Sequence, residues 1–178
     1  MLFSRFRRGA HAGTISALYG MIVAQARLPA FYRDYAVADT VNGRFELLVL
    51  HLSLVLDRLA LDEAAKPLGQ GLFDRFCQDM DHNLREMGVG DLKVPAEMRR
   101  MGEAYYGRAQ AYQAALAADD GPALVEAVRR NVYGGAAEAA PERLAAYIRA
   151  ASRDLRAQEA QSLAGGSLRF PDPALIPG

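Results

Sequence analysis

The sequence predicts an all-α protein: a single helical-bundle domain of about six to seven helices with a disordered C-terminal tail. Apolar residues recur at helical spacing along most of the 178 residues, and no segment alternates between apolar and polar residues as a half-buried strand does. Gly and Pro fall where helices would begin and end. We therefore predict a flexible basic N-terminus over residues 1–13, a helical domain over 14–161 and a Gly/Pro-rich tail over 162–178.

Six helices are predicted from their periodicity together with their start and stop residues. They cover about residues 15–26, 40–60, 72–87, 95–118, 122–131 and 141–161. Thr14 and either Asp39 or Thr40 are the expected N-caps of the first two, because their side-chain oxygens can accept a bond from the first turn. Pro29 opens a short aromatic segment between these helices. Residues 45–56 are almost entirely apolar, which is typical of a helix at the centre of a bundle.

Glycines and prolines mark the boundaries of the later helices. Gly88 suits the position just after a helix C-terminus, and Pro95 and Pro141 fit first helical turns, where a missing N–H removes no bond. One face of the helix after Pro95 carries Met98, Met101, Tyr105, Tyr112 and Leu116. From residue 162 onward, the density of Gly and Pro predicts a poorly ordered tail.

The charge balance excludes a dedicated nucleic-acid binder. The chain has 21 Lys and Arg against 21 Asp and Glu, a net charge of zero, whereas nucleic-acid binders carry a basic excess. The first 33 residues nevertheless hold no acid and five arginines, which are Arg5, Arg7, Arg8, Arg27 and Arg33. No secretory signal is visible. We predict a cytoplasmic protein that could dock peripherally at the inner face of the cytoplasmic membrane.

The densest polar cluster lies in the third predicted helix. Asp79 and His82 are three residues apart and could face one metal ion, but the second half of a di-metal pattern is missing,. A Mg²⁺-dependent prenyl enzyme using Asp74, Asp79 and Asp81 is a weaker alternative, since the usual Asp-Asp-x-x-Asp run is absent. A solvated face with an Asp81–Arg85 ion pair is favoured. We predict no enzyme, no catalytic residue, no metal site and no cofactor.

Two single residues favour a structural interpretation over a functional one. His51 lies inside the apolar helix, where a hydrogen-bonded core histidine is more common than a ligand. Cys77 is the only cysteine and lies among apolar neighbours. We therefore predict a buried structural thiol in a reducing compartment.

A basic strip follows Gly88. It consists of Lys93, Arg99, Arg100 and Arg108, of which Arg100 and Arg108 approximate one helix face,. Two interpretations stay open: a solvated helix side with scattered charge, or a surface for an anionic or RNA-containing partner. The second has a chemical basis, because arginine can bind phosphate through two N–H groups at once.

Six short strings stand in a fixed order along the chain. They are LYG at 18–20, DTVNGRFE at 39–46, LHL at 50–52, LFD at 72–74, DMDHNLREMGVGD at 79–91 and MGEAYYGR at 101–108. In this order they resemble the bacterial members of the ubiquinol–cytochrome c chaperone family, the Cbp3-like proteins. The resemblance extends over about residues 14–135, and the string at 79–91 is its most specific part.

The resemblance implies an α-helical, non-enzymatic assembly factor. Mitochondrial members of the family assist the biogenesis of cytochrome b, the membrane subunit of the bc1 complex. They act with a small partner protein, near the ribosomal exit and the inner membrane. The sequence here has no long targeting extension, which is expected of a bacterial member. The family has no catalytic residues that could be assigned to this chain.

We therefore predict a chaperone for cytochrome b or the bc1 complex that binds its client through an apolar groove between helices. Residues 45–56, the methionines at 98 and 101 and the tyrosines at 105, 106 and 112 would line this groove or, equally, form the core. The expected client is nascent or newly inserted cytochrome b, or another bc1 subunit. The ribosome or an anionic membrane surface is a further expected partner, and no specific DNA binding is expected.

The candidate partner-binding residues are charged or aromatic. They are Arg5, Arg7, Arg8, Asp81, Arg85, Asp91, Lys93, Arg100, Tyr105 and Arg108. The alternative function is a lipid- or quinone-binding helical module, because the same surplus of apolar helix residues would suit an isoprenoid or acyl chain.

Overall fold

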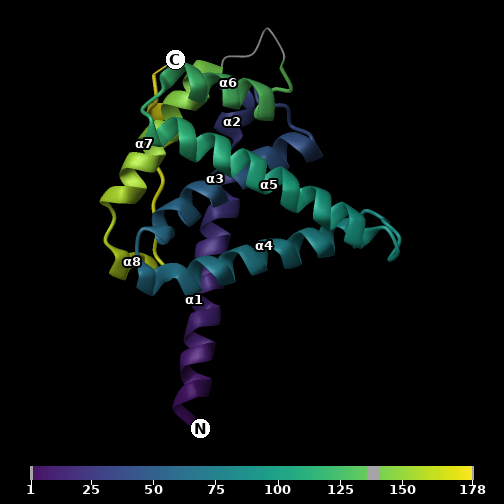
Figure 1. Ribbon diagram of the computed structural model, residues 1–178, viewed down its shortest axis with the longest axis vertical. Helices are drawn as coiled ribbons and strands as arrows, with labels where there is room; N and C mark the ends of the chain where they lie inside the picture. The colour runs from purple at the N-terminus through teal and green to yellow at the C-terminus, as the bar shows by residue number, and fades with distance from the viewer. Residues whose placement is uncertain (1, 136–140, 178) are drawn as a thin grey trace.

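The structure is a computed structural model that describes residues 2–135 and 141–177 (Figure 1). For residues 2–11 it describes the backbone alone. Its α-helices are α1 (Leu2–Ala26), α2 (Pro29–Arg33), α3 (Val41–Ala60), α4 (Lys66–Glu86), α5 (Val94–Ala117), α6 (Gly121–Val132), α7 (Pro141–Ala157) and α8 (Ala160–Ala164). Two 3₁₀ turns, η1 (Glu63–Ala65) and η2 (Pro173–Leu175), complete the regular elements. The described residues contain no strand, so the predicted all-α class is confirmed.

α3 occupies the centre of the bundle. It packs against α1, α4, α5, α6 and α7, and all of its residues from 46 to 55 are buried. Thr40 caps its N-terminus, because the Thr40 Oγ1 accepts a hydrogen bond from the Gly43 backbone N–H at 3.1 Å,. The predicted central helix and one of its two predicted caps are thus confirmed.

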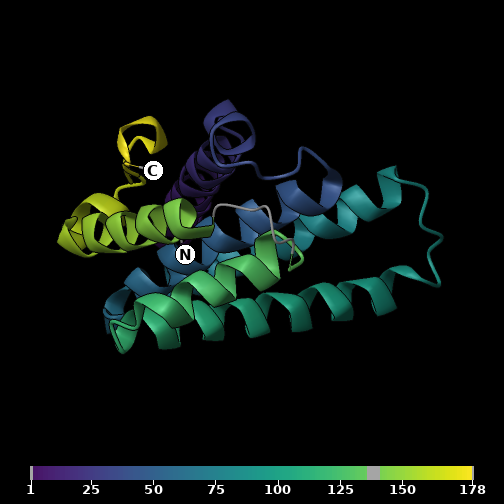
Figure 2. The same cartoon turned by 90° about the horizontal axis from the view of Figure 1, so that it is seen from above.

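α4 and α5 form a long hairpin whose connecting turn projects to one side of the other helices (Figures 1 and 2). Gly88 follows the end of α4 with a φ of +80°, a conformation that glycine adopts without strain, so this predicted helix end is confirmed,. Arg85 donates to Asp81 at 2.8 Å and also to Asp91. The predicted Asp81–Arg85 pair therefore extends into a link between the end of α4 and the turn.

Two helix starts differ from the sequence prediction. α1 begins at Leu2 rather than after Thr14, and α4 begins at Lys66 rather than near residue 72. Pro67 explains the second difference, because a proline in the first turn fits a helix start,. The prediction of a flexible segment over 1–13 falls almost entirely on residues whose side chains lie outside the described part.

The helix predicted over residues 141–161 is divided into α7 and α8. At the break, the Gln158 Nε2 donates to the Arg169 carbonyl and the Gln158 Oε1 accepts from the Arg169 N–H, both at 2.8 Å. Arg58 of α3 donates to the Leu155 and Gln158 carbonyls at 3.0 and 2.7 Å. The two Arg58 bonds satisfy backbone carbonyls at the helix end, and the Gln158 side-chain bonds attach the break to Arg169,.

The C-terminal segment differs from the expected disordered tail. Residues 165–177, called the C-terminal strap below, are bonded to α1, to Tyr35 just after α2, and to α7. The Tyr35 hydroxyl donates to the Pro173 carbonyl at 2.7 Å, and Arg143 donates to the Ile176 carbonyl at 3.1 Å. Leu168 is buried. The Gly and Pro content predicted disorder, but a few apolar anchors and proline carbonyls suffice to fix this segment.

His51 is a hydrogen-bonded core residue, as predicted. Its Nδ1 lies 2.7 Å from the Leu47 carbonyl, which can only accept, so Nδ1 carries the proton,. Its Nε2 therefore accepts from the Tyr147 hydroxyl at 2.9 Å, and Tyr147 in turn accepts from Gln25 at 3.0 Å. The Phe170 ring of the strap stacks edge-on against His51, with centroids 5.2 Å apart. This network joins α1, α3, α7 and the C-terminal strap.

We expect Gly43→Ala to lower the free energy of unfolding by about 1–3 kcal/mol, the range for overpacked positions. A Cβ at this position would lie 2.0 Å from the Ala38 carbonyl oxygen, so backbone would have to shift. Urea unfolding followed by circular dichroism measures the change. Gly20→Ala is the matched control, because a Cβ there meets nothing within 4 Å. Equal stabilities of Gly43→Ala and the wild type would contradict the prediction.

Candidate functional site

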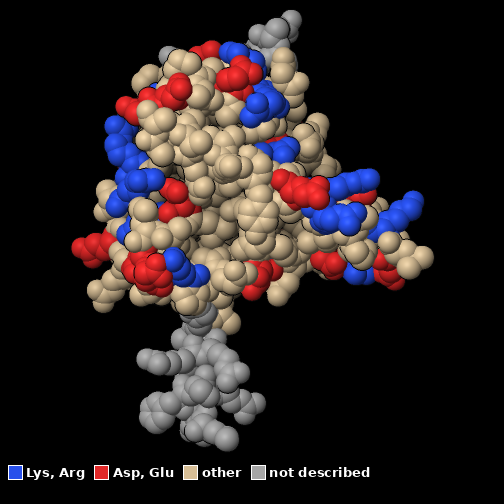
Figure 3. All heavy atoms as spheres, in the orientation of Figure 1, with Lys and Arg blue, Asp and Glu red and all other residues tan. Residues whose placement is uncertain are grey.

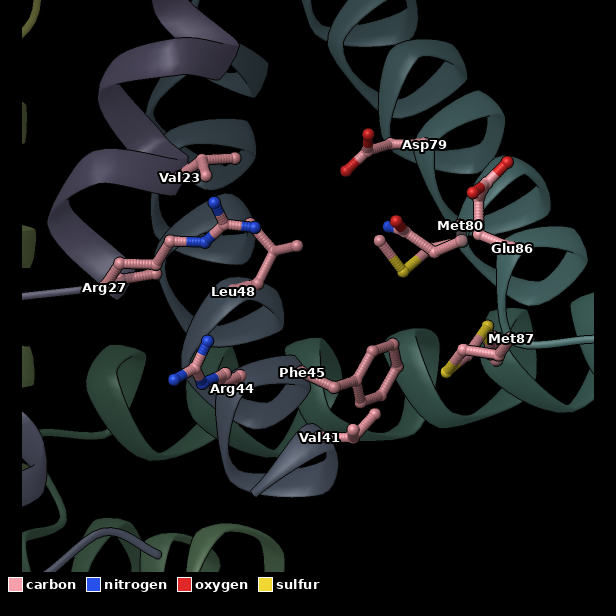
Figure 4. A pocket seen from close by; sticks show the side chains of 13 residues that line it. Val23, Arg27, Val41, Arg44, Phe45, Leu48, Asp79, Met80, Glu86 and Met87 are labelled. Atoms are coloured by element: carbon pink, nitrogen blue, oxygen red, sulfur yellow. The ribbon is translucent and has the colours of Figure 1, made fainter. Parts of the chain in front are cut away.

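A pocket of about 320 Å³ opens between α1, α3, α4 and α5 (Figure 4). We call it the apolar groove. Its lining residues are Val23, Ala26, Arg27, Val41, Arg44, Phe45, Leu48, Asp79, Met80, Asn83, Glu86, Met87 and Met101. Phe45 and Leu48 come from α3, so the apolar run that places α3 at the centre also supplies part of this surface.

Methionines and exposed apolar side chains give the groove an adaptable surface. Met80, Met87 and Met101 are three of the six methionines of the chain. Methionine is flexible and polarizable, so it suits surfaces that contact more than one shape. At the rim, the Val41 side chain is 70% exposed and Met87 is 54% exposed. Exposed apolar groups gathered at one concave site indicate a place where another molecule binds.

The groove has charged side chains on two opposite walls. Figure 4 shows Arg27 and Arg44 on one side and Asp79 and Glu86 on the other. Arg44 donates to Asp39 at 2.7 Å. Arg27 and Glu86 make no ion pair or side-chain hydrogen bond with any residue that the structure describes.

Tyr19 fixes the position of Asp79. The Tyr19 hydroxyl donates to the Asp79 Oδ2 at 2.9 Å, and the Arg75 guanidinium lies 5.6 Å from the centre of the Tyr19 ring. Burial, together with the neighbouring carboxylate, raises the pKa of Tyr19, so its hydroxyl keeps its proton and remains a donor,. No local pattern in the sequence predicts the Tyr19–Asp79 bond, because the two residues are 60 positions apart.

The remaining aspartates of the predicted cluster have separate partners. Asp74 accepts from Gln70 at 2.8 Å, whereas Asp81 is paired with Arg85. Within the described residues, no three His, Cys, Asp or Glu side chains gather closely enough to hold a metal ion. Cys77 is half-buried rather than fully buried, because its position on α4 lies at the edge of the core-facing side, and burial raises the pKa of its thiol.

Arg108 is held in an ion pair with Glu46 of α3. Its Nε and Nη2 donate to the two Glu46 carboxylate oxygens, both at 2.5 Å, and its Nη1 donates to the Ala104 carbonyl at 3.1 Å. Glu46 is fully buried. Arg108 thus joins α5 to α3, and three of its five N–H donors bond to groups within the protein,. No local pattern in the sequence predicts Glu46 as the partner of Arg108, because the two residues are 62 positions apart.

Three other candidate residues, Lys93, Arg100 and Tyr105, do not line the groove. Lys93 and Arg100 lie near the projecting turn of the α4–α5 hairpin, where Arg100 is paired with Glu97 at 2.7 Å. Figure 3 shows basic and acidic side chains side by side in that region. Tyr105 is buried, with its ring 5.0 Å from that of Phe73. The side chains of Arg5, Arg7 and Arg8 are outside the described part of the chain.

The seven predicted residues whose side chains the structure describes therefore do not form one surface. The groove is built instead from Arg27, Arg44, Asp79 and Glu86 with apolar residues between them. The string at 79–91 contributes five of its members to the groove, so part of it is surface and part is packing. Among the helices that the structure describes, none combines the length and hydropathy needed to cross a bilayer.

Comparisons with known proteins give one family and one similar structure. The family model described as ubiquinol-cytochrome C chaperone matches residues 33–170. The chain is similar to the crystal structure of the Cbp3 homolog from Brucella abortus, with 36% sequence identity and a TM-score of 0.89, covering 99% of this chain and 100% of that one. A search of curated proteins gives no significant match. The family-model match includes every groove residue except Val23, Ala26 and Arg27.

Proposed function

Because the chain belongs to the ubiquinol–cytochrome c chaperone family, we propose that it is a non-enzymatic assembly chaperone for cytochrome b or another subunit of the bc1 complex. The client, nascent or newly inserted, binds in the apolar groove. The protein acts in the cytoplasm, at the inner face of the cytoplasmic membrane. The observation that carries the proposal is the groove itself, a concave apolar surface with exposed Val41 and Met87 at its rim.

The size of the groove supports a client that inserts side chains. A volume of about 320 Å³ lies at the lower end of the roughly 300–1,000 Å³ range of binding pockets,. It accepts a few apolar side chains, whereas a whole helix, about 10–12 Å across, is too wide. A client segment would lie over the groove and place one row of its side chains inside, as helix-in-groove recognition does.

The genetic test deletes the gene for this protein in a bacterium that makes a bc1 complex. Heme b absorbance of isolated membranes then measures assembled bc1 complex. We expect a clear loss of heme b and its recovery when the wild-type gene is returned. Unchanged heme b in the deletion strain would contradict the proposed function.

We expect Val41→Glu and Met87→Glu to weaken client binding about tenfold or more, because each places a charge among the apolar groups that the client must cover. Both side chains are largely exposed, so the stability of the free protein changes little,. Site-specific crosslinking to newly made cytochrome b measures the binding. Leu61→Glu is the matched control, because Leu61 is 61% exposed and does not line the groove. Equal crosslinking by all three variants would place the client elsewhere.

The lipid- or quinone-binding alternative rests on the same groove. This alternative would be supported if one lipid or quinone per chain stays bound through purification and if Val41→Glu abolishes this binding. Native mass spectrometry makes this measurement.

The basic N-terminus and the α4–α5 turn are proposed to approach the membrane surface or the ribosome. Leu92 in this turn is 98% exposed, and Lys93 follows it. An exposed apolar side chain next to a basic one suits the interface of an anionic membrane. Flotation with phosphatidylglycerol vesicles at low salt tests this contact. Equal flotation of Lys93→Glu and the wild type would show that the turn does not contribute to membrane binding.

A further inference from the structure

Two charged side chains of the apolar groove, Arg27 and Glu86, have no ion-pair partner among the described residues. Arg27 lies at the end of α1 and Glu86 lies in the last turn of α4, on opposite walls (Figure 4). Most of the other charged side chains near the groove are already satisfied, so these two are the ones available to a partner.

The second charged residue on each wall is held in place. Arg44 is paired with Asp39 at 2.7 Å, which balances its charge. Arg27 is therefore the unpaired positive charge of the basic wall. Tyr19 binds one oxygen of Asp79 at 2.9 Å, so the acidic wall keeps a fixed carboxylate beside Glu86. Between these walls lie Phe45, Leu48 and the methionines. The groove is thus an apolar floor between a basic wall and an acidic wall.

We propose that the groove binds an amphipathic helix of the client whose apolar face points into the groove, with an acidic flank and a basic flank. This inference rests on the proposed function and names the chemistry of the segment recognised. A wholly apolar membrane-spanning segment would cover Arg27 and Glu86 without pairing them, which is unfavourable. An amphipathic helix inserts side chains at i, i+3 or i+4, and i+7, and its two flanks then face the two walls.

Four fluorescein-labelled synthetic helices of about 18 residues, five turns, test the proposal. All share one leucine face. The mixed peptide has Glu on one flank and Lys on the other, and the remaining three have Glu on both flanks, Lys on both flanks, or Gln on both flanks. Fluorescence anisotropy measures their dissociation constants. We expect the mixed peptide to bind about threefold to tenfold more tightly than the others, because only it forms a favourable pair at each wall.

The charge preference should change in opposite directions in two variants. Arg27→Glu makes both walls acidic, so the all-Lys peptide becomes the tightest binder. Glu86→Lys places an ammonium group beside the Asp79 carboxylate, so the second wall becomes neutral and the mixed peptide loses its advantage over the all-Glu peptide. The double variant has one acidic and one neutral wall, so the all-Lys and mixed peptides should bind about equally and more tightly than the all-Glu peptide. The differences should shrink at about 1 M salt, where the Debye length falls to about 3 Å.

Arg99→Glu and Glu103→Lys are the matched controls. Both side chains are exposed on α5, have no ion pair within the described part of the chain and do not line the groove. They make the same charge changes and should leave the order of the peptides unchanged. Circular dichroism confirms that each variant is folded.

Three results would overturn the inference. The first is equal affinity for the mixed peptide and the Gln peptide, and the second is the same order of peptide affinities in Arg27→Glu, Glu86→Lys and the wild type. The third is no binding of any peptide at concentrations up to about 100 µM, which would be a weak affinity for a specific site. Each leaves the proposed function standing if heme b still depends on the gene. Heme b that is independent of the gene would overturn the proposed function, whatever the peptide order.

Discussion

Arg108→Ala is expected to lower the free energy of unfolding by about 3–5 kcal/mol, the range found when one partner of a buried ion pair is removed. The Glu46 side chain is 0% exposed and that of Arg108 is 23% exposed. Without Arg108, the carboxylate would remain among α3 and α5 with no charge to balance it. For a chain of this size the melting temperature should fall by about 6–20 °C. Differential scanning calorimetry and urea unfolding measure both quantities.

Two comparisons separate this effect from a general loss of packing. Arg85→Ala removes exposed ion pairs with Asp81 and Asp91 and should change stability by less than about 1 kcal/mol,. The double variant Glu46→Leu, Arg108→Leu removes both charges and should be much more stable than Arg108→Ala, because apolar replacements of buried pairs are often neutral. An Arg108→Ala protein as stable as Arg85→Ala would show that the pair is unimportant.

The same variant should acquire a pH dependence. Burial raises the pKa of Glu46, and the Arg108 guanidinium opposes that rise, so its removal raises this pKa further. At pH values between the pKa of Glu46 in the unfolded chain, near 4.3, and its raised pKa in the folded protein, the folded protein binds a proton that the unfolded chain does not bind. The stability of Arg108→Ala should therefore fall as the pH rises above about 4.3, and more steeply than that of the wild type. Unfolding curves at pH 5 and pH 8 test the sign.

Acidification from pH 7 to pH 4 is expected to remove about 3 kcal/mol of stability through His51 alone. Complete burial lowers its pKa to about 4, whereas the unfolded side chain titrates near 6.5. In this interval the unfolded chain binds a proton that the folded protein excludes, so stability is complete above about pH 6.5 and is lost as the pH falls toward 4. Charging the ring would also leave the Tyr147 hydroxyl facing a second donor at Nε2.

The contribution of His51 is measured as a difference between proteins. Urea unfolding across pH 4–7 should show a drop in the wild type that His51→Leu lacks. His82→Ala is the matched control, because His82 is exposed on α4 and its variant should follow the wild-type curve. Parallel curves for the wild type and His51→Leu would show that His51 does not titrate as its burial requires.

Local patterns predicted most of the fold. Thr40, Gly88 and Pro141 mark helix boundaries through the geometry of a single turn, and the structure places each at such a boundary. The apolar run at 45–56 predicted the central helix and a buried His51. Such features depend on residues within a few positions of one another, which a sequence displays directly.

Features that join distant parts of the chain were not predictable in this way. Glu46 and Arg108 are 62 residues apart, and His51 and Tyr147 are 96 residues apart. Arg108 was identified as a partner-binding candidate because its charge is visible in the sequence, whereas its partner is determined by the packing of α3 against α5. The groove was expected on α3 and α5, but its charged walls come from Arg27 and from the far end of α4.

The C-terminal strap determines how late in synthesis the protein can finish folding. The Phe170 ring of the strap contacts His51 of α3, and the Tyr35 hydroxyl, just after α2, donates to the Pro173 carbonyl 138 residues later. At about 5–20 residues per second, the ribosome needs about 7–28 s to make that stretch. Until the strap has been made, the N-terminal helices lack the segment that covers them in the finished protein. A chaperone proposed to protect an unfinished membrane subunit thus passes through an incomplete state of its own during synthesis.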